Sequence, residues 1–311
     1  MPNIWQNQTC PARTKPVCLL LVIISLRYRE THERQWVYMI ISRFAPSPTG
    51  DLHLGHAYSA WLGRQRSDIW RLRFEDIDTT RCHPAFIESA MRDLAWLGLT
   101  WDGEIRLQSA HFQDYAGALA KLQARGLIYP CFCTRREIIQ AQSAPHAGEA
   151  VYPGTCRQLS EAEGQRRMKA GQPYALRLDV QRACIGVDGL KFFDDNSGWV
   201  TAEPQRLGDV VLARKETPSS YHLCVVHDDA LQGITHVIRG EDLREATHIQ
   251  VLLQRLLGYE TPSYLHHKLL RGQDGKRLAK RDKAETLASL RLRGTDPADI
   301  LRKFGSPQGF E

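Results

Sequence analysis

Residues 43–56 read R-F-A-P-S-P-T-G-D-L-H-L-G-H, and this stretch decides the fold more than any other part of the chain. Apolar residues 37–41 precede it and predict a β-strand, while its prolines and glycine predict a tight loop. His53 and His56 then open an apolar-periodic run that predicts a helix. The predicted order is strand, loop and helix start, with both imidazoles on one face of the first helical turn.

Such a helix start suits the binding of a triphosphate. The N–H groups at a helix N-terminus lack intrahelical partners and carry the positive end of the helix dipole. His53 and His56 can donate hydrogen bonds to charge that develops on phosphates. Gly55 has no Cβ and therefore permits a nucleotide to approach closely. Taken alone, however, two histidines after a proline-rich loop are equally typical of an ordinary surface helix.

The whole string resembles the first signature of the class I aminoacyl-tRNA synthetases, and its wording is similar to that of the glutamyl subclass. The resemblance implies an ATP-dependent enzyme that binds its nucleotide with Mg²⁺. It also implies that the ATP site contains Pro46, His53, Gly55, His56 and a lysine from a second, late loop.

Residues 275–282 read G-K-R-L-A-K-R-D and match that late loop. Lys280 would act as a mobile cation on the β- and γ-phosphates, which completes a catalytic set with His53 and His56. The signature loop would comprise Arg277, Leu278, Ala279, Lys280 and Arg281. The family pattern usually has serine at the position of Ala279, so one hydroxyl contact is missing. In isolation this tract would be interpreted as a solvated basic stretch.

Polar residues follow several predicted strands, where ligands of open α/β sheets bind. The segments 72–78, 220–226 and 234–242 each read as a buried strand that ends in polar residues. The glutamyl resemblance implies that Arg43 and Arg239 hold a side-chain carboxylate, for which a planar guanidinium is preferred.

The same resemblance assigns the rest of an amino-acid site. Glu75 would hold the α-ammonium group, and Tyr221 would donate its hydroxyl. Ala45 and Ser47 would contact the same substrate. Glutamate carries two negative groups and one positive group, and this set offers the complementary charges.

Three of the eight cysteines have a spacing that suits a metal. Cys131 and Cys133 form C-x-C, and Tyr152 and Cys156 follow as Y-x-x-x-C. The resemblance to the insertion domain of one synthetase subgroup implies that these four residues hold a structural, tetrahedral Zn²⁺. From spacing alone, His146 would be considered before a tyrosine. Reduced cysteines of a cytosolic protein are the alternative.

The expected fold class is α/β, a Rossmann-like doubly wound parallel sheet with an inserted zinc-containing subdomain. Helices are predicted over 85–97, 111–125, 160–170 and 245–257, with one or two more after residue 284, and short strands over 175–178 and 191–193. The predicted division is an extension (1–38), the first half of a nucleotide-binding domain (39–99), the insertion (100–205), the second half (206–267), and the lysine loop with a short basic helical tail (268–311).

Composition agrees with a globular enzyme that meets RNA. The 311 residues, 42% of them hydrophobic, suffice for one substantial core and a smaller unit. Of the net charge of +6, residues 1–38 contribute +3 and residues 268–311 contribute +5, which leaves −2 for the middle. A basic C-terminal face suits an RNA backbone, although a solvated helix would look the same.

The first 38 residues predict neither a membrane anchor nor an export signal. The apolar run 18–26 is too short to span a bilayer, and no small-residue cleavage site follows it. We expect residues 1–38 to be disordered and outside the fold. The protein is expected in the cytoplasm, without membrane contact and as a monomer.

Only 30 residues follow Arg281, too few for a further domain of ordinary size that could bind an anticodon. The resemblance covers residues 39 to about 303 and is best for the glutamyl-queuosine tRNA(Asp) synthetase family, which are truncated paralogues. Its members activate L-glutamate with ATP and attach it to the queuosine base of tRNA(Asp). The open alternatives are a compact glutamyl-tRNA synthetase, a non-catalytic adenylate- or RNA-binding paralogue, and another nucleotidyltransferase.

Overall fold

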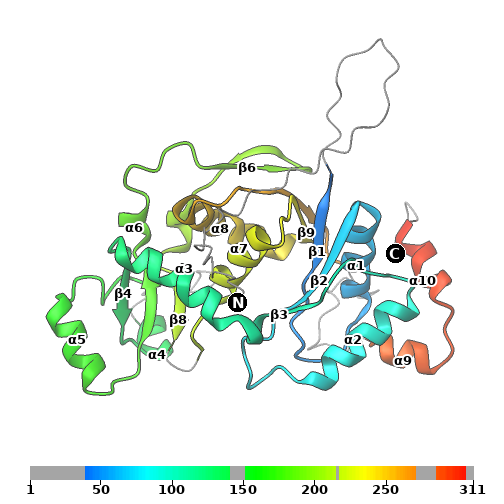
Figure 1. The fold of residues 1–311 in the computed structure, drawn as a ribbon, viewed down its shortest axis with the longest axis horizontal. Helices are drawn as coiled ribbons and strands as arrows, with labels where there is room; N and C mark the ends of the chain where they lie inside the picture. Colours follow the sequence, from blue (N-terminus) through cyan, green and yellow to red (C-terminus); the bar gives the residue numbers. More distant parts are fainter. Residues whose placement is uncertain (1–38, 141–150, 215–216, 271–284, 306–311) are drawn as a thin grey trace, which may run out of the picture. The chain divides into compact units, whose positions relative to one another are not determined.

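Parallel strands from distant parts of the chain lie side by side at the centre of the fold (Figure 1). The computed structural model describes residues 39–140, 151–214, 217–270 and 285–305. The first parallel sheet has the order β1 (Ile41–Phe44), β2 (Ile69–Phe74), β3 (Arg106–Leu107). The second sheet has the order β7 (Gly198–Thr201), β6 (Lys191–Asp194), β10 (Ser263–His267), β9 (His236–Gly240).

The two sheets continue each other where β1 lies beside β9 (Figure 1). The backbone N–H of Thr235 donates to the carbonyl of Ile41 at 2.9 Å, and the Ile41 N–H donates to the Thr235 hydroxyl at 2.9 Å. The spatial order is therefore β3-β2-β1-β9-β10-β6, and the chain order reverses at β1. This is the doubly wound arrangement that the sequence predicts, with its switch point between β1 and β9.

The first strand and first helix differ slightly from the prediction. The strand expected over 37–41 instead begins at Ile41 and runs through Phe44, because Phe44 packs into the core and stacks on Trp70. Residues 37 and 38 lie outside the described part of the chain. Helix α1 (Leu54–Gln65) begins where predicted, directly after His53.

The strand predicted over 220–226 is wrong, because this segment begins helix α7 (Tyr221–Leu231). Ser220 is the N-cap, and its hydroxyl accepts a hydrogen bond from the N–H of Leu223. The four apolar residues 223–226 are all buried. A helix that is buried on all sides gives a continuous apolar run, which periodicity cannot distinguish from a buried strand.

The four helices predicted before residue 284 are confirmed to within one residue at each end, as α2 (Pro84–Trp96), α3 (Phe112–Ala124), α5 (Glu161–Lys169) and α8 (Arg244–Leu257). Helix α8 ends at Gly258, whose φ of 74° is the left-handed conformation that favours glycine. The remaining helical elements are α4 (Arg135–Gln140), α6 (Val180–Ala183), α9 (Leu287–Leu292), α10 (Pro297–Gly305) and the 3₁₀ turns Gln108–His111, Pro204–Leu207 and Glu241–Leu243.

The insertion has its own antiparallel sheet, with the strand order β4 (Ile128–Cys131), β5 (Ala175–Leu178), β8 (Val211–Arg214). The expected boundary between residues 205 and 206 does not follow this pairing. Strands β6 and β7 precede that boundary but belong to the central sheet, because β6 pairs with β10. Strand β8 follows it but pairs with β5 of the insertion. The chain thus crosses between the two sheets more often than the sequence suggests.

Two large apolar clusters fill the fold, one around β1, β2, α1 and α2, and the other around α3, α7 and α8. Tail helices α9 and α10 pack onto the first cluster through the buried side chains of Leu287, Leu290, Ile300 and Phe304. Among the described residues, none of the helices has both the length and the apolar character needed to cross a bilayer.

Candidate active site and cysteine cluster

The two histidines form the start of helix α1. His53 is the N-cap, and its Nδ1 accepts a hydrogen bond from the N–H of Gly55 at 3.1 Å. The Nδ1 of His56 accepts from the N–H of His53 at 3.2 Å, and the ring centroids lie 3.8 Å apart. Because each neutral ring uses Nδ1 as an acceptor, its proton is on Nε2. The helix cap therefore prepares both imidazoles to donate from Nε2.

The chain returns to this helix start just after the predicted lysine loop. The N–H of Leu287 donates to the carbonyl of Leu52 at 2.8 Å, and Thr286 forms a β-bridge with His53. The signature-loop residues lie outside the described part of the chain: Arg277, Leu278, Ala279, Lys280 and Arg281. Residues 286 and 287, which follow that segment, are anchored beside the first histidine.

Four residues predicted for the amino-acid site come together near the carboxyl ends of the strands. Arg43 is on β1, Glu75 follows β2, Arg239 is on β9, and Tyr221 opens α7. The Nη1 of Arg239 donates to the Tyr221 hydroxyl at 3.4 Å. Burial raises the pKa of this hydroxyl, and the positive charges of Arg239 and Arg43 oppose the shift. Strands β2, β1 and β9 are neighbours in the sheet, which brings Glu75, Arg43 and Arg239 to the same edge.

The loop between β1 and α1 supplies the other predicted contacts. The Pro46 carbonyl accepts from the N–H of Glu75 at 3.1 Å, which ties this loop to the end of β2. Pro46 is buried, Ala45 is half-buried and Ser47 is exposed. All three residues belong to the loop that connects Arg43 on β1 with His53 at the start of α1.

Glu75 has an unusual protonation equilibrium. Burial raises its pKa to about 7, although the positive charges of Arg73 and Arg43 oppose this shift. Near neutral pH the side chain is thus divided between its neutral and ionised forms. A ligand ammonium group would favour the ionised form.

A buried network of ion pairs that includes Arg43 was not predicted from the sequence. The Nε of Arg43 and the Nη2 of Arg73 both contact Oδ1 of Asp229, at 2.9 and 2.7 Å. The neighbouring Asp228 accepts from the Nε of Arg106 at 2.7 Å. Burial opposes the ionisation of Asp229, but Arg43 and Arg73 outweigh it and lower its pKa. The two adjacent aspartates after the apolar run 223–226 could have indicated buried ion pairs.

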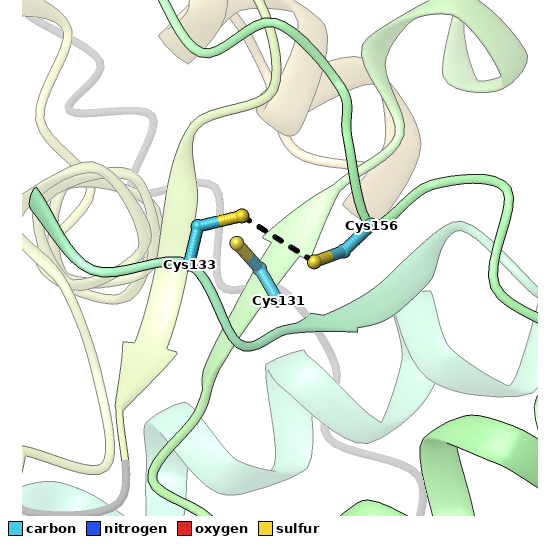
Figure 2. Close-up of side chains that lie close together, drawn as sticks. All are labelled: Cys131, Cys133 and Cys156. Carbon is cyan, nitrogen blue, oxygen red and sulfur yellow. Dashed lines mark hydrogen bonds between the residues drawn. The ribbon is translucent and has the colours of Figure 1, made fainter. Parts of the chain in front are cut away.

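The cysteine cluster lies in the insertion, where β4 ends (Figure 2). The Sγ atoms of Cys131, Cys133 and Cys156 lie within 4.8 Å of one another and point toward a common centre. The Sγ atoms of Cys133 and Cys156 are 3.5 Å apart, and the Tyr152 hydroxyl lies 3.6 Å from that of Cys133. Two thiolates about 2.3 Å from one tetrahedral ion would be separated by about 3.8 Å. These three thiols could hold a metal ion.

Tyr152 belongs to the same cluster. Its hydroxyl accepts from the N–H of Cys156 at 2.8 Å, and the guanidinium of Arg177 lies 3.8 Å from the centre of its ring. Burial raises the pKa of Tyr152, so the ring is neutral without a metal ion. A hydrogen-bond donor and a cation are both in place to stabilise a phenolate. The alternative ligand His146 lies outside the described residues.

Comparison with known proteins gives a consistent result. The model of the family "tRNA synthetases class I (E and Q), catalytic domain" matches residues 39–304. A relative from Rhodobacter capsulatus, named glutamyl-Q tRNA(Asp) synthetase, is 48% identical over 281 residues, which cover 86% of this chain and 100% of that protein. A relative of the same name from Symbiobacterium thermophilum is 42% identical and covers 85% and 84% of the two chains.

Solved structures agree with this result. The glutamate-tRNA synthetase of Elizabethkingia anophelis is similar with a TM-score of 0.73 and 26% identity, over 86% of this chain and 61% of that chain. The present chain thus spans about three fifths of the length of that enzyme.

Proposed function

This chain belongs to the class I tRNA synthetases for glutamate and glutamine, and from that premise we propose that it activates L-glutamate with ATP and transfers it to the queuosine base of tRNA(Asp). One observation carries the first half of the proposal: Arg43, Glu75 and Arg239 lie at the ends of neighbouring strands, beside Tyr221, and β1 leads into the two-histidine helix start. The names of the two relatives support the second half.

In the first step, the α-carboxylate of glutamate attacks the α-phosphorus of ATP, which forms glutamyl-adenylate and releases pyrophosphate. The N-terminus of α1 and the Nε2–H groups of His53 and His56 would stabilise the negative charge on the departing phosphates. Lys280 would add a mobile positive charge. Mg²⁺ would arrive with ATP and neutralise part of the phosphate charge. In the second step, a hydroxyl of the queuosine cyclopentenediol attacks the acyl carbon and AMP leaves.

Recognition of glutamate would use the two charged sides of the site. Arg239 and Arg43 would bind the side-chain carboxylate, and ionised Glu75 would hold the α-ammonium group. Tyr221 would donate its hydroxyl, while Ala45 and Ser47 line the approach to α1. Positioning of the α-carboxylate beside the phosphates would then carry much of the rate enhancement.

The cysteine cluster would have a separate, structural role. Cys131, Cys133, Cys156 and Tyr152 would bind one Zn²⁺, which would stabilise the end of β4 and the following loop of the insertion. Four protein ligands leave no open position on the ion, so this role does not include catalysis.

Acylation of tRNA is the direct test. Purified protein, ATP, Mg²⁺ and labelled glutamate are incubated with queuosine-containing tRNA(Asp), and in parallel with queuosine-free tRNA(Asp) and with tRNA(Glu). We expect label only on the first RNA, and glutamate-dependent pyrophosphate exchange without any RNA. Label on tRNA(Glu) would instead identify a compact glutamyl-tRNA synthetase. Absence of exchange would identify a non-catalytic paralogue. ATP and tRNA are cytoplasmic substrates, so we place the activity in the cytoplasm.

A further inference from the structure

Arg239 is held by a chain of buried residues that the proposed chemistry does not use. Its Nε donates to the Nε2 of His266 at 3.2 Å. The Nδ1 of the same ring lies 2.5 Å from Oδ2 of Asp194. His266 is on β10 and Asp194 is on the neighbouring β6, so the central sheet itself brings the two together. Both side chains are buried, with exposed fractions of 4% for His266 and 0% for Asp194.

The direction of these hydrogen bonds follows from their chemistry. A guanidinium can only donate and a carboxylate can only accept, so the imidazole between them must be protonated on Nδ1 and accept at Nε2. Asp194 is itself fixed, because its Oδ1 accepts from the N–H of Asn196 at 3.0 Å. The Nδ2 of Asn196 in turn donates to the backbone carbonyl of His266 at 2.7 Å. Asp194 therefore determines which nitrogen of His266 faces Arg239.

The other contacts of Arg239 in the described part of the chain are also with uncharged groups. Its Nη2 donates to the Thr247 hydroxyl at 2.7 Å, and its Nη1 donates to the Tyr221 hydroxyl at 3.4 Å. The ring of Tyr264 lies below the guanidinium, 5.3 Å away, and stacks on His266. Three of the five guanidinium N–H groups are thus used, which leaves one on each terminal nitrogen for a ligand.

We propose that His266 and Asp194 are positioning residues for Arg239, and that they set the preference of the site for a ligand carboxylate over the neutral amide of glutamine. The inference rests on the proposed function and deepens it. The hydrogen-bonded chain from Asp194 through His266 fixes the plane of the Arg239 guanidinium. Because the ring that contacts Arg239 is neutral, the positive charge of Arg239 remains available to an anion. A fixed two-pronged donor matches a carboxylate, whereas an amide can accept at only one of its two polar atoms.

The test uses Asp194→Asn in the full chain, with glutamate-dependent pyrophosphate exchange as the assay. Asparagine can donate to Nδ1 of His266, which would move the ring proton to Nε2. Nε2 could then no longer accept the hydrogen bond from the Nε–H of Arg239. We expect KM for glutamate to rise about 10- to 100-fold, while KM for ATP and kcat change less than about threefold. The preference for glutamate over glutamine in kcat/KM should fall as well.

Two further variants separate positioning from general damage. His266→Phe removes the acceptor and should reproduce the effect on glutamate. His248→Phe is the matched control. His248 is also buried, and its Nδ1 accepts from the N–H of Glu203, which is not among the hydrogen-bond partners of Arg239. We expect His248→Phe to leave KM for glutamate nearly unchanged. The proposal would be overturned if Asp194→Asn raised KM for glutamate and KM for ATP by the same factor, or if His248→Phe raised KM for glutamate as much as Asp194→Asn does.

A double-variant cycle gives the sharpest result. Arg239→Lys keeps the charge but has no Nε–H for His266 to accept. In that background, Asp194→Asn should change KM for glutamate by less than about twofold, because its effect acts through the missing contact. An undiminished effect would overturn the positioning role. Failure of the proposed function would appear differently, as unmodified protein that does not exchange pyrophosphate with glutamate.

Discussion

Arg43 and Arg239 are the same residue type, equally buried at 5% exposure, and lie on the two strands that flank the switch point. Their surroundings are opposite. Arg43 shares the carboxylate of Asp229 with Arg73, so part of its charge is already compensated within the protein. Arg239 contacts the neutral groups of Tyr221, Thr247 and His266. Arg43 is thus tied into the folded framework as well as facing the proposed site, whereas Arg239 has only uncharged partners among the described residues and is poised for an anion.

The comparison predicts its largest effect for Asp229→Ala. Removal of this carboxylate leaves two buried guanidinium groups without their shared partner, which typically costs about 3 to 5 kcal/mol of unfolding free energy. Urea denaturation followed by circular dichroism measures the loss. Asp299→Ala is the control, because Asp299 forms an exposed pair with Arg302 that is worth little. A loss below about 1 kcal/mol would show that the ion network does not hold the framework.

A second prediction contrasts the cysteine cluster with both arginines. Cys156→Ser should abolish stoichiometric zinc and lower the unfolding free energy by roughly 3 kcal/mol, since loss of a structural metal is among the larger destabilising changes. KM for glutamate should stay within about twofold. Metal content by mass spectrometry and thermal melting are the measurements, with Cys184→Ser as control. Wild-type protein without bound zinc would remove the proposed role of the cluster.

Arg239→Gln should have the reverse profile of Asp229→Ala. The loss of the positive charge should reduce kcat/KM for glutamate about 100-fold, the value expected for a charge-assisted pair. Unfolding free energy should change by less than about 1 kcal/mol, because the partners that remain are uncharged. Pyrophosphate exchange and urea denaturation on one preparation give both values. A large loss of stability would mean that the two arginines do not differ as described.

The smallest predicted effect concerns the pH dependence of Glu75, beside Arg43. Its pKa of about 7 means that the free enzyme loses the carboxylate charge as pH falls through 7. We therefore expect kcat/KM for glutamate to decrease about tenfold per pH unit below 7 and to level off above it. Glu75→Gln should lower the plateau and abolish this slope. An unchanged acid limb in that variant would assign the titration to another group.

The sequence placed correctly in the fold those proposed site residues that lie close together in the chain. His53, Gly55 and His56 fall within one helical turn, and Arg239 lies in the buried strand β9, inside the predicted range 234–242. The helix α7 was predicted as a strand because the four consecutive apolar residues 223–226 are all buried and leave no helical period in the sequence. As a result, the position of Tyr221 relative to the strands was misjudged.

The supporting residues could not be predicted for a different reason. Asp194 and His266 are 72 positions apart and meet only because β6 joins the central sheet beside β10. In the sequence Asp194 opens the polar run 194–197 and His266 begins the polar run 266–268, and such runs at the end of a short strand are ordinarily at the surface. Only the order of the strands shows that both face the interior.

The cap of helix α1 has a consequence for how this enzyme can change. At many catalytic positions, mutation to alanine stabilises a protein while it removes activity. Here the rings that we propose to face the nucleotide also satisfy the first backbone N–H groups of the helix. Loss of His53 would forfeit a helix cap, worth about 1 kcal/mol, together with turnover. The same ring atoms of His53 and His56 would serve both stability and catalysis. A substitution at either position is therefore expected to lower both, rather than to improve one at the expense of the other.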